Sequence, residues 1–272
     1  MKNLLAVLIL PGLLLSSYVS EAQPIINSHP IALSLANCDA TLANHFSGFS
    51  SPAGLGDVHH SGFVLMGERR FNLNELSMGG AALVIATSQG TWGVLGSRMG
   101  FATWQSSRYA ASYSRAFGKQ VFAGFQFNYW SEYQAQAGTF GSFCSQAGII
   151  YQPSTDFSIG VHMMNPEQAA INYGDFSMPL PSFFSLGASW KPISAATLYL
   201  EADKPMTEPL QIAAAIEGQV CSMLFLRGGY AYTSQQVSGG VGVLFNPIEV
   251  HIGFLSNQPL GWISSASILW QF

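Results

Sequence analysis

The sequence is poor in charged residues. Asp, Glu, Lys and Arg make up 9% of its 272 residues, against roughly 25% in an average soluble chain. Hydrophobic residues reach 49% and the mean hydropathy is +0.26, so either the core is very large or much of the folded surface meets lipid. The formal net charge of −4 and the pI near 5.8 argue against a nucleic-acid partner, which needs a basic face.

The sequence also lacks closely spaced pairs of cysteines, which bind zinc, and it lacks long apolar runs. Its three cysteines (Cys38, Cys144 and Cys221) lie far apart, which excludes a zinc site built from closely spaced pairs. Three unpaired cysteines, or one disulfide with one thiol left over, both remain open. Beyond Ala22 no run of 18 or more apolar residues occurs, so no transmembrane helix is expected.

The first 22 residues have the pattern of a secretory signal peptide. Lys2 precedes an apolar run from Leu4 to Leu15, and small residues at Ser20 and Ala22 suit cleavage after Ala22. The chain is therefore expected to be exported. In a bilayer only helices and closed barrels satisfy the backbone, and helices are excluded here. The sequence predicts an all-β protein: a closed antiparallel transmembrane β-barrel in the outer membrane, with lipid as its partner.

Two regions follow the signal peptide. Residues 23–60 are rich in Pro, Asn and Ser and predict an extended or short-helical segment, and residues 61–272 predict the barrel. From residue 61 on, runs of about ten residues alternate with period two. Between Val121 and Trp130, for example, Phe125 and Phe127 share one face and Gln126 the other. A soluble, secreted β-sandwich also alternates, but it would need more charge on its outward face.

The alternation predicts about fourteen strands, an even number as in bacterial barrels. Their expected starts lie near residues 62, 77, 90, 107, 120, 140, 157, 182, 196, 210, 221, 237, 248 and 262. If the first strand rises from the periplasm, the periplasmic links are short turns. The outer links at 99–106, 131–138 and 165–181 are expected to be longer. The chain ends in an alternating segment whose Trp270 and terminal Phe272 form an expected barrel-assembly signal.

Several short motifs, in order, resemble one group of outer-membrane barrels. Ser51-Pro52-Ala53-Gly54 resembles the Asn-Pro-Ala-Gly hatch motif of FadL-type barrels, with Ser51 in place of Asn. Residues 180–187 (LPSFFSLG) and 226–230 (LRGGY) resemble late-strand patterns of the PorV/PorQ group of Bacteroidota, within the FadL superfamily. The resemblance implies fourteen strands and an N-terminal plug inside the lumen.

The resemblance also implies two roles. PorV-like barrels are accessory or cargo-related parts of outer-membrane protein machines such as type IX secretion, so secretion or assembly proteins are expected partners. FadL-like barrels instead pass small hydrophobic compounds across the outer membrane. The accessory role is taken as the leading interpretation and hydrophobic transport as the alternative.

The charges of the late strands fall on the lumen face. They are expected to form a polar network inside the barrel, whose members are Glu201, Asp203, Glu217, Arg227, Glu249 and His251. Charges inside a barrel face water or each other, so the network either anchors the plug or lines a narrow polar path.

No catalytic residue, metal site or cofactor is predicted. His251 lies near Glu249, and Ser238 and Ser267 lie on neighbouring strands, but no nucleophile or metal signature surrounds them. The adjacent His59 and His60 point to opposite sides of an extended segment, which does not suit one metal ion. Eight aromatic residues near strand ends are expected to form interfacial girdles: Tyr109, Tyr113, Trp130, Tyr151, Trp190, Tyr232, Trp262 and Trp270.

Overall fold

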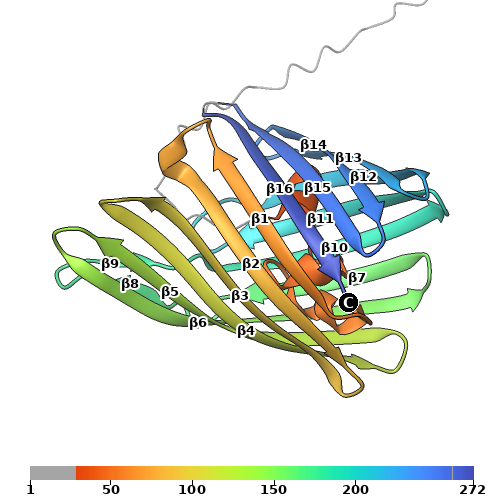
Figure 1. The fold of residues 1–272 in the computed structure, drawn as a ribbon, viewed down its shortest axis with the longest axis horizontal. Coiled ribbons are helices and arrows are strands. Elements are labelled where there is room, and N and C mark those ends of the chain that lie inside the picture. Colours follow the sequence, from red (N-terminus) through yellow and green to blue (C-terminus); the bar gives the residue numbers. More distant parts are fainter. Residues whose placement is uncertain (1–28, 259) are drawn as a thin grey trace, which may run out of the picture.

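A computed structural model describes residues 29–258 and 260–272. The predicted signal peptide, residues 1–22, and the first residues of the expected plug lie outside this range. Within it, fourteen strands close an antiparallel barrel in which β1 pairs with β16 (Figure 1). No helix of the described residues is long and apolar enough to cross a membrane.

The barrel strands begin within a few residues of their predicted starts, and the predicted fold is confirmed. Their bounds are β1 Gly62–Arg70, β2 Ser77–Thr87, β3 Gly90–Phe101, β4 Trp104–Phe117, β5 Val121–Gln134, β6 Gly138–Ser154, β7 Phe157–Met164, β10 Phe183–Ile193, β11 Ala196–Pro205, β12 Gln211–Cys221, β13 Leu224–Ala231, β14 Gln236–Phe245, β15 Ile248–Asn257 and β16 Gly261–Gln271.

The two ends of the barrel differ. We call the end that holds Phe272 the terminal end and the opposite end the far end. Every link between described strands at the terminal end has two or three residues, as predicted. Among the described residues, the ladder shifts register only at this end, at Tyr151/Ser154, Trp190/Ile193 and Gln219/Cys221. The middle of the described wall therefore has a continuous hydrogen-bonded ladder.

At the far end, two of the three predicted long loops are wrong. The strands continue instead: β3 and β4 are joined by two residues, and β5 and β6 by three. Polar residues of these segments pair within the ladder, as Ser106 does with Glu132. Beyond the apolar band a strand can carry polar side chains on both faces, so the loss of alternation did not mark a loop. The β5–β6 hairpin forms much of the far left end of Figure 1.

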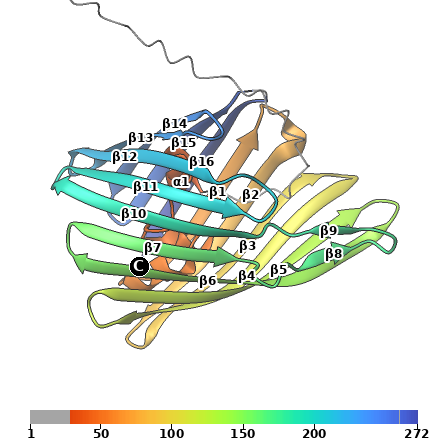
Figure 2. The ribbon, with the colours of Figure 1, turned by 180° about the vertical axis from the view of Figure 1, so that it is seen from behind.

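The third predicted loop, residues 165–181, is long, but it contains a hairpin that the sequence did not predict. Strands β8 (Ala170–Asn172) and β9 (Ser177–Pro179) pair with each other, and β8 packs against β6 (Figure 2). Ile171 is fully buried in a cluster with Trp130 and Met164. The hairpin thus extends the apolar interior of the barrel toward the far end.

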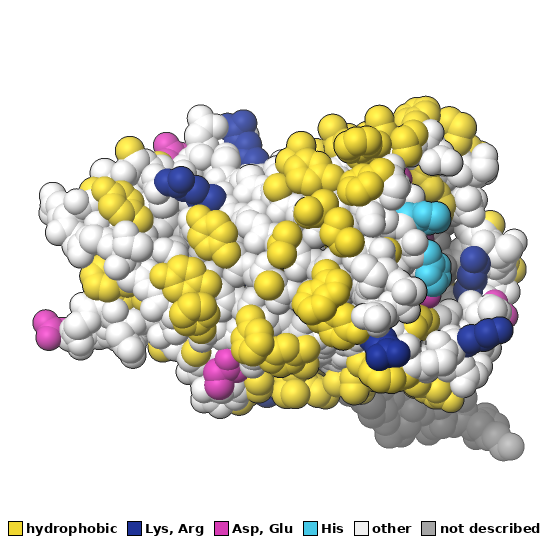
Figure 3. All heavy atoms as spheres, turned by 60° about the horizontal axis from the view of Figure 1, so that its bottom comes forward, with side chains coloured by type: hydrophobic (Ala, Val, Ile, Leu, Met, Phe, Trp, Pro, Cys, Tyr) yellow, Lys and Arg dark blue, Asp and Glu magenta, His cyan; other side chains and the backbone are white. Residues whose placement is uncertain are grey.

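The outer surface of the barrel is apolar. Along β5, Phe125 and Phe127 are exposed while Gln126 and Asn128 are buried, so the predicted alternation is confirmed. Figure 3 shows hydrophobic side chains spread over the middle of the surface and charged ones toward the two ends. This distribution matches a lipid-facing band between two polar rims.

The segment before β1 lies inside the barrel and forms the plug, defined here as residues 29–60. It contains α1 (Pro30–Ser34) and the 3-10 helices η1 (His45–Gly48) and η2 (Pro52–Asp57), and a further 3-10 turn, η3 (Asn74–Leu76), follows β1. Helix α1 contacts β13–β16, and η2 contacts β3–β6, so the plug reaches across the lumen. Leu35, Phe46 and Leu55 have no exposed surface, and burying each stabilises the seated plug by roughly 2 kcal/mol.

Candidate functional site

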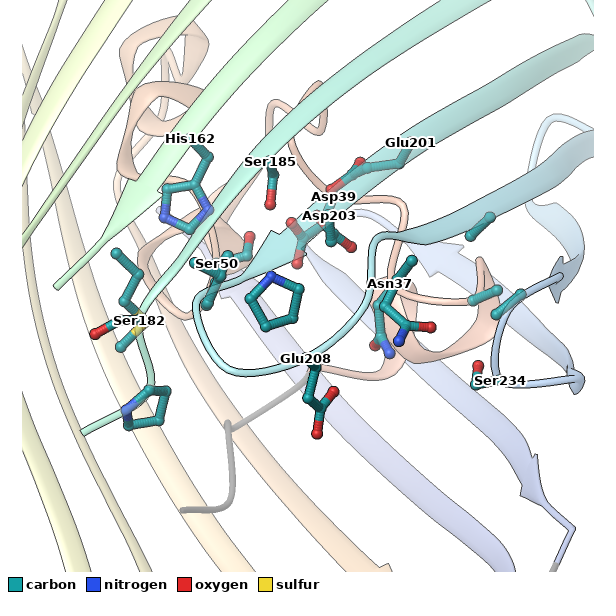
Figure 4. A pocket seen from close by; sticks show the side chains of 18 of the residues that line it. Asn37, Asp39, Ser50, His162, Ser182, Ser185, Glu201, Asp203, Glu208 and Ser234 are labelled. Atoms are coloured by element: carbon teal, nitrogen blue, oxygen red, sulfur yellow. The ribbon is translucent and has the colours of Figure 1, made fainter. Parts of the chain in front are cut away.

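A cavity of about 620 Å³ lies between the plug and the far end of the barrel. Its lining comes from the plug, from the far ends of the strands on both sides of the barrel, and from the β9–β10 segment (Figure 4). Much of the wall is apolar and includes Leu33, Phe49, Met164, Phe183 and Leu255. A mainly apolar, concave space with a few polar groups is the usual form of a small-molecule site.

The floor of the cavity carries carboxyl groups from the plug and from β11. The backbone N–H of Ala40 donates a hydrogen bond to Glu201 Oε2 at 3.0 Å. Asp39 and Asp203 also line the cavity, and Figure 4 shows both beside Glu201. Burial, with the nearby Asp203 charge, raises the pKa of the Asp39 carboxyl well above its usual value. Glu201 therefore both anchors the plug and faces the cavity.

The predicted lumen network is divided into two groups. Glu201 and Asp203 form the cavity floor, whereas the other four residues lie near the terminal end. Arg227 Nε donates to Glu217 Oε2 at 2.6 Å, and Arg227 Nη1 lies 3.3 Å from His251 Nδ1. His251 Nε2 lies 3.2 Å from Glu249 Oε2. This second group meets the plug through Phe46, whose ring contacts the His251 ring edge-on.

The hatch-like motif is wedged between the barrel wall and the rest of the plug. Ser51 and Ala53 have no exposed surface, and the Pro52 carbonyl accepts a hydrogen bond from Ser114 Oγ at 2.6 Å. A Cβ at Gly54 would lie 2.0 Å from the carbonyl oxygen of Leu42. Only glycine fits at that close approach, so the motif's glycine keeps η2 packed against the preceding plug turn.

Most other bonds between wall and plug also end on plug backbone. Carbonyl oxygens of the plug accept five side-chain hydrogen bonds from four strands, β3, β4, β6 and β14. The pairs are Ser34 with Ser238, Phe49 with Arg108, Ser50 with Gln146, Pro52 with Ser114 and Val58 with Thr91. Backbone acceptors are the same for every residue type, so these anchors leave no signature in the plug sequence.

Arg108 is the largest fully buried side chain in the described chain. It donates to Asn128 Oδ1 at 2.9 Å and to Gln146 Oε1 at 3.2 Å, besides the Phe49 carbonyl at 3.3 Å. Its guanidinium carbon lies 5.6 Å from the centre of the Trp130 ring. Trp130 is thus buried in the lumen, and its expected place in an interfacial girdle is wrong, because the inward parity of β5 places it there.

The C-terminal residues close the barrel on its outer side. Trp270 and Phe272 are both more than half exposed, with ring centroids 5.4 Å apart. The Phe272 N–H donates to the Ser61 carbonyl at 2.9 Å, where the chain enters β1. An assembly signal at these residues would therefore be presented toward lipid, beside the β1–β16 seam.

The residues considered as catalytic or metal-binding candidates do not form such a site in the described part of the chain. Ser238 donates to the plug carbonyl of Ser34, and neither Ser238 nor Ser267 is hydrogen-bonded to His251. His59 and His60 are exposed. In the described part of the chain, no group of three or more His, Cys, Asp or Glu side chains is placed to hold a metal ion. Its three cysteines are free.

Sequence reasoning missed four residues of the site: Asp39, Arg108, His162 and Ser185. Alternation does place His162 and Ser185 on the lumen face. Register then sets Ser185 between His162 on β7 and Asp203 on β11. Asp39 lies in an irregular segment, so no periodicity marks it. Only the folded chain shows that Asp39, His162 and Ser185 line one cavity, and that Arg108 lies outside its lining.

No family model matches the sequence, and no curated protein matches it. Solved structures do match. The Ralstonia pickettii toluene transporter TbuX is 11% identical, with a TM-score of 0.67 over 91% of this chain and 99% of that one. The Pseudomonas putida toluene transporter TodX is 9% identical, with a TM-score of 0.65 over 93% and 99%. A Pseudomonas aeruginosa FadL homologue is 10% identical, with a TM-score of 0.58 over 90% and 98%.

At these identities the likeness concerns the fold alone. The matched proteins are covered over nearly their whole length. Together with the closed fourteen-stranded wall, the apolar outer band and the internal plug, the match shows that this chain is a closed antiparallel β-barrel with the FadL-type fold.

Proposed function

We propose that this barrel passes small hydrophobic compounds across the outer membrane, by way of the cavity between the plug and the far end. The observation that carries the proposal is that cavity, about 620 Å³ in volume and lined largely by apolar side chains. The description of the similar barrels TbuX and TodX as toluene transporters supports an apolar cargo. Passage then requires the plug to shift, because the plug reaches across the lumen. Its hydrogen bonds to the wall must break when it does so.

The test fills the cavity. Ala213 faces the lumen and lines the cavity, while its neighbour Ala214 faces lipid. The native chain, Ala213→Trp and Ala214→Trp are produced in cells whose own FadL-type channels have been deleted, and uptake of radiolabelled toluene is measured. The native chain and Ala214→Trp are expected to raise uptake, and Ala213→Trp to abolish the increase. A folded native barrel that leaves uptake at the level of the parent cells would contradict the proposal.

A second candidate is an accessory role in an outer-membrane protein machine, such as type IX secretion. The continuous ladder through the middle of the described wall favours it, since a lateral exit to lipid would need a kink or bulge there. Purification in mild detergent followed by mass spectrometry separates the two. Co-purification of a stoichiometric secretion or assembly protein supports the accessory role, and recovery of the barrel alone with a hydrophobic ligand contradicts it.

A further inference from the structure

The cavity has an acidic character that its apolar walls do not require. Among its described lining residues, Asp39, Glu201, Asp203 and Glu208 carry carboxyl groups, and Arg70 is the one Lys or Arg. Three of the four carboxyls meet at the floor, where the plug touches β11 (Figure 4). Arg70 is engaged by Glu68. The polar end of any ligand that reaches the floor therefore meets mostly carboxyl groups.

Several polar atoms at this floor have no hydrogen-bond partner. Glu201 is 3% exposed, and its Oε1 is unpaired although Oε2 binds the plug. Asp203 Oδ1 is also unpaired, and so are both ring nitrogens of His162, which is 2% exposed. Buried polar atoms are nearly always hydrogen-bonded in folded proteins. A polar group placed among these atoms would complete their hydrogen bonding.

The unpaired groups lie close enough to serve one ligand. Ser185 pairs in register with His162 on one side and with Asp203 on the other. Neighbouring strands are about 4.8 Å apart, so the three side chains form one row across β7, β10 and β11. Figure 4 shows this row facing the same space as Asp39 and Glu201. The unpaired atoms of the row and of Glu201 are predominantly acceptors.

The rest of the cavity suits an apolar body. Phe49 of the plug and Met164, Phe183, Leu255 and Ile263 of the wall line it above and beside the acidic floor. A ligand that fills this space thus has an apolar body and one polar end that donates hydrogen bonds.

We infer that the cavity selects amphipathic organic amines: compounds with an apolar body and a single ammonium group. This rests on the proposed function and specifies its ligand class. An ammonium group offers three donors and a positive charge, which match the free oxygens of Glu201 and Asp203. A carboxylate of the same size would add one more carboxyl group to a buried cluster of them, and it could donate no hydrogen bond to their oxygens.

The experiment compares three probes that share one body: 4-phenylbutylamine, 4-phenylbutanol and 4-phenylbutyrate. The full barrel is placed in lipid nanodiscs, and binding at neutral pH is measured by equilibrium dialysis against empty nanodiscs. We expect the amine to bind about tenfold tighter than the carboxylate, the effect of roughly one charge-assisted hydrogen bond, with the alcohol between them.

The variants test which groups cause the preference. In the Glu201→Gln/Asp203→Asn double variant the side chains keep their size, and the amide introduced at the first position retains an oxygen for the Ala40 N–H. The ratio of amine to carboxylate affinity is expected to fall toward one. Glu249→Gln removes a lumen carboxyl that does not line the cavity, and it is expected to keep the native ratio. Heat-modifiable migration on gels verifies that each variant is a folded barrel.

The outcomes separate this inference from the proposed function. Equal or tighter binding of the carboxylate to the native barrel overturns the amine preference, and so does a preference that survives in the folded double variant. In both cases binding of the alcohol still supports an apolar ligand site. If none of the three probes binds above the empty nanodiscs, the hydrophobic-ligand function fails as well.

Discussion

Arg108 Nη1 donates a hydrogen bond to the carbonyl oxygen of Phe49 at 3.3 Å, from the inner face of β4 to the middle of the plug. Among the described residues no carboxylate forms an ion pair with this arginine. Its partners are neutral oxygens and the Trp130 ring. This buried arginine therefore helps to hold the plug against the barrel wall.

Replacing Arg108 is therefore expected to loosen the plug while the barrel persists. In Arg108→Met the Phe49 carbonyl loses a donor that is worth roughly 1.5–3 kcal/mol when charged. Backbone amides of residues 46–53 should then exchange with deuterium about tenfold faster or more, measured by mass spectrometry. Arg98→Met, on the exposed face of β3, is the control. Equal exchange in the two variants would show that Arg108 does not hold the plug.

Replacing a glycine of the barrel wall should destabilise the protein where that glycine contacts the plug, and not elsewhere. A Cβ at Gly160 would lie 2.1 Å from the Ala40 carbonyl oxygen, whereas one at Gly79 would meet nothing within 4 Å. Gly160→Ala should displace the Ala40 turn, weaken its bond to Glu201 and cost about 1–3 kcal/mol, as overpacking does. Gly79→Ala should be nearly neutral. Thermal unfolding followed by heat-modifiable migration measures both, and a larger loss for Gly79→Ala would refute the contact.

The plug is expected to be held less firmly inside the barrel at acidic pH, because His29 becomes protonated when the plug is released. This buried residue caps α1 by accepting from the Ala32 N–H, and its ring stacks on Phe46. Burial first, then the charges of His251 and Arg227, lowers the His29 pKa from 6.5 to about 3. A released plug therefore binds a proton that the seated plug does not, so stability is full above pH 6.5 and falls as the pH drops toward 3.

The loss through His29 should amount to roughly a few kcal/mol across that window. His29→Asn keeps a capping acceptor without the titration. The expected result is a shallower acid dependence of plug release, measured by limited proteolysis between about pH 7 and pH 4. Because the other titrating groups are common to both proteins, the difference between the two profiles reports His29. Identical profiles would remove His29 as the cause.

The terminal aromatic should matter for assembly more than for packing. Phe272 and Phe245 are similarly exposed at the terminal end, on neighbouring regions of the wall. If the chain end is an assembly signal, Phe272→Ser lowers the amount of folded barrel recovered from outer membranes several-fold, and Phe245→Ser does not. The heat-modifiable fraction on gels provides the measurement. Equal yields of the two variants would show that Phe272 is not an assembly signal but a lipid-facing side chain like Phe245.

Strand β5 shows what the alternation of polar and apolar residues can predict. Its period of two is local, and it places Phe125 and Phe127 toward lipid and Gln126 inside without any tertiary information. The same period does not mark the strands at the far end, where Ser106 and Glu132 pair in a ladder that extends into the segments predicted as loops. There the polarity of the surroundings no longer distinguishes the two faces, and the pattern that marks a strand disappears although the strand persists.

The sequence by itself determined the closed barrel, its fourteen strands and the inward direction of Glu201, Asp203, Arg227 and His251, because each depends on composition or on a period of two. Only the tertiary structure decided which inward groups meet. Ala40 and Glu201 are 161 positions apart, and the Ala40 backbone N–H donates a hydrogen bond to the Glu201 side chain. Every residue type except proline has such an N–H, so the sequence at position 40 does not predict this contact. The division of the polar network, the docking of the plug and the acidic floor of the cavity all depend on such contacts, which register and barrel closure fix.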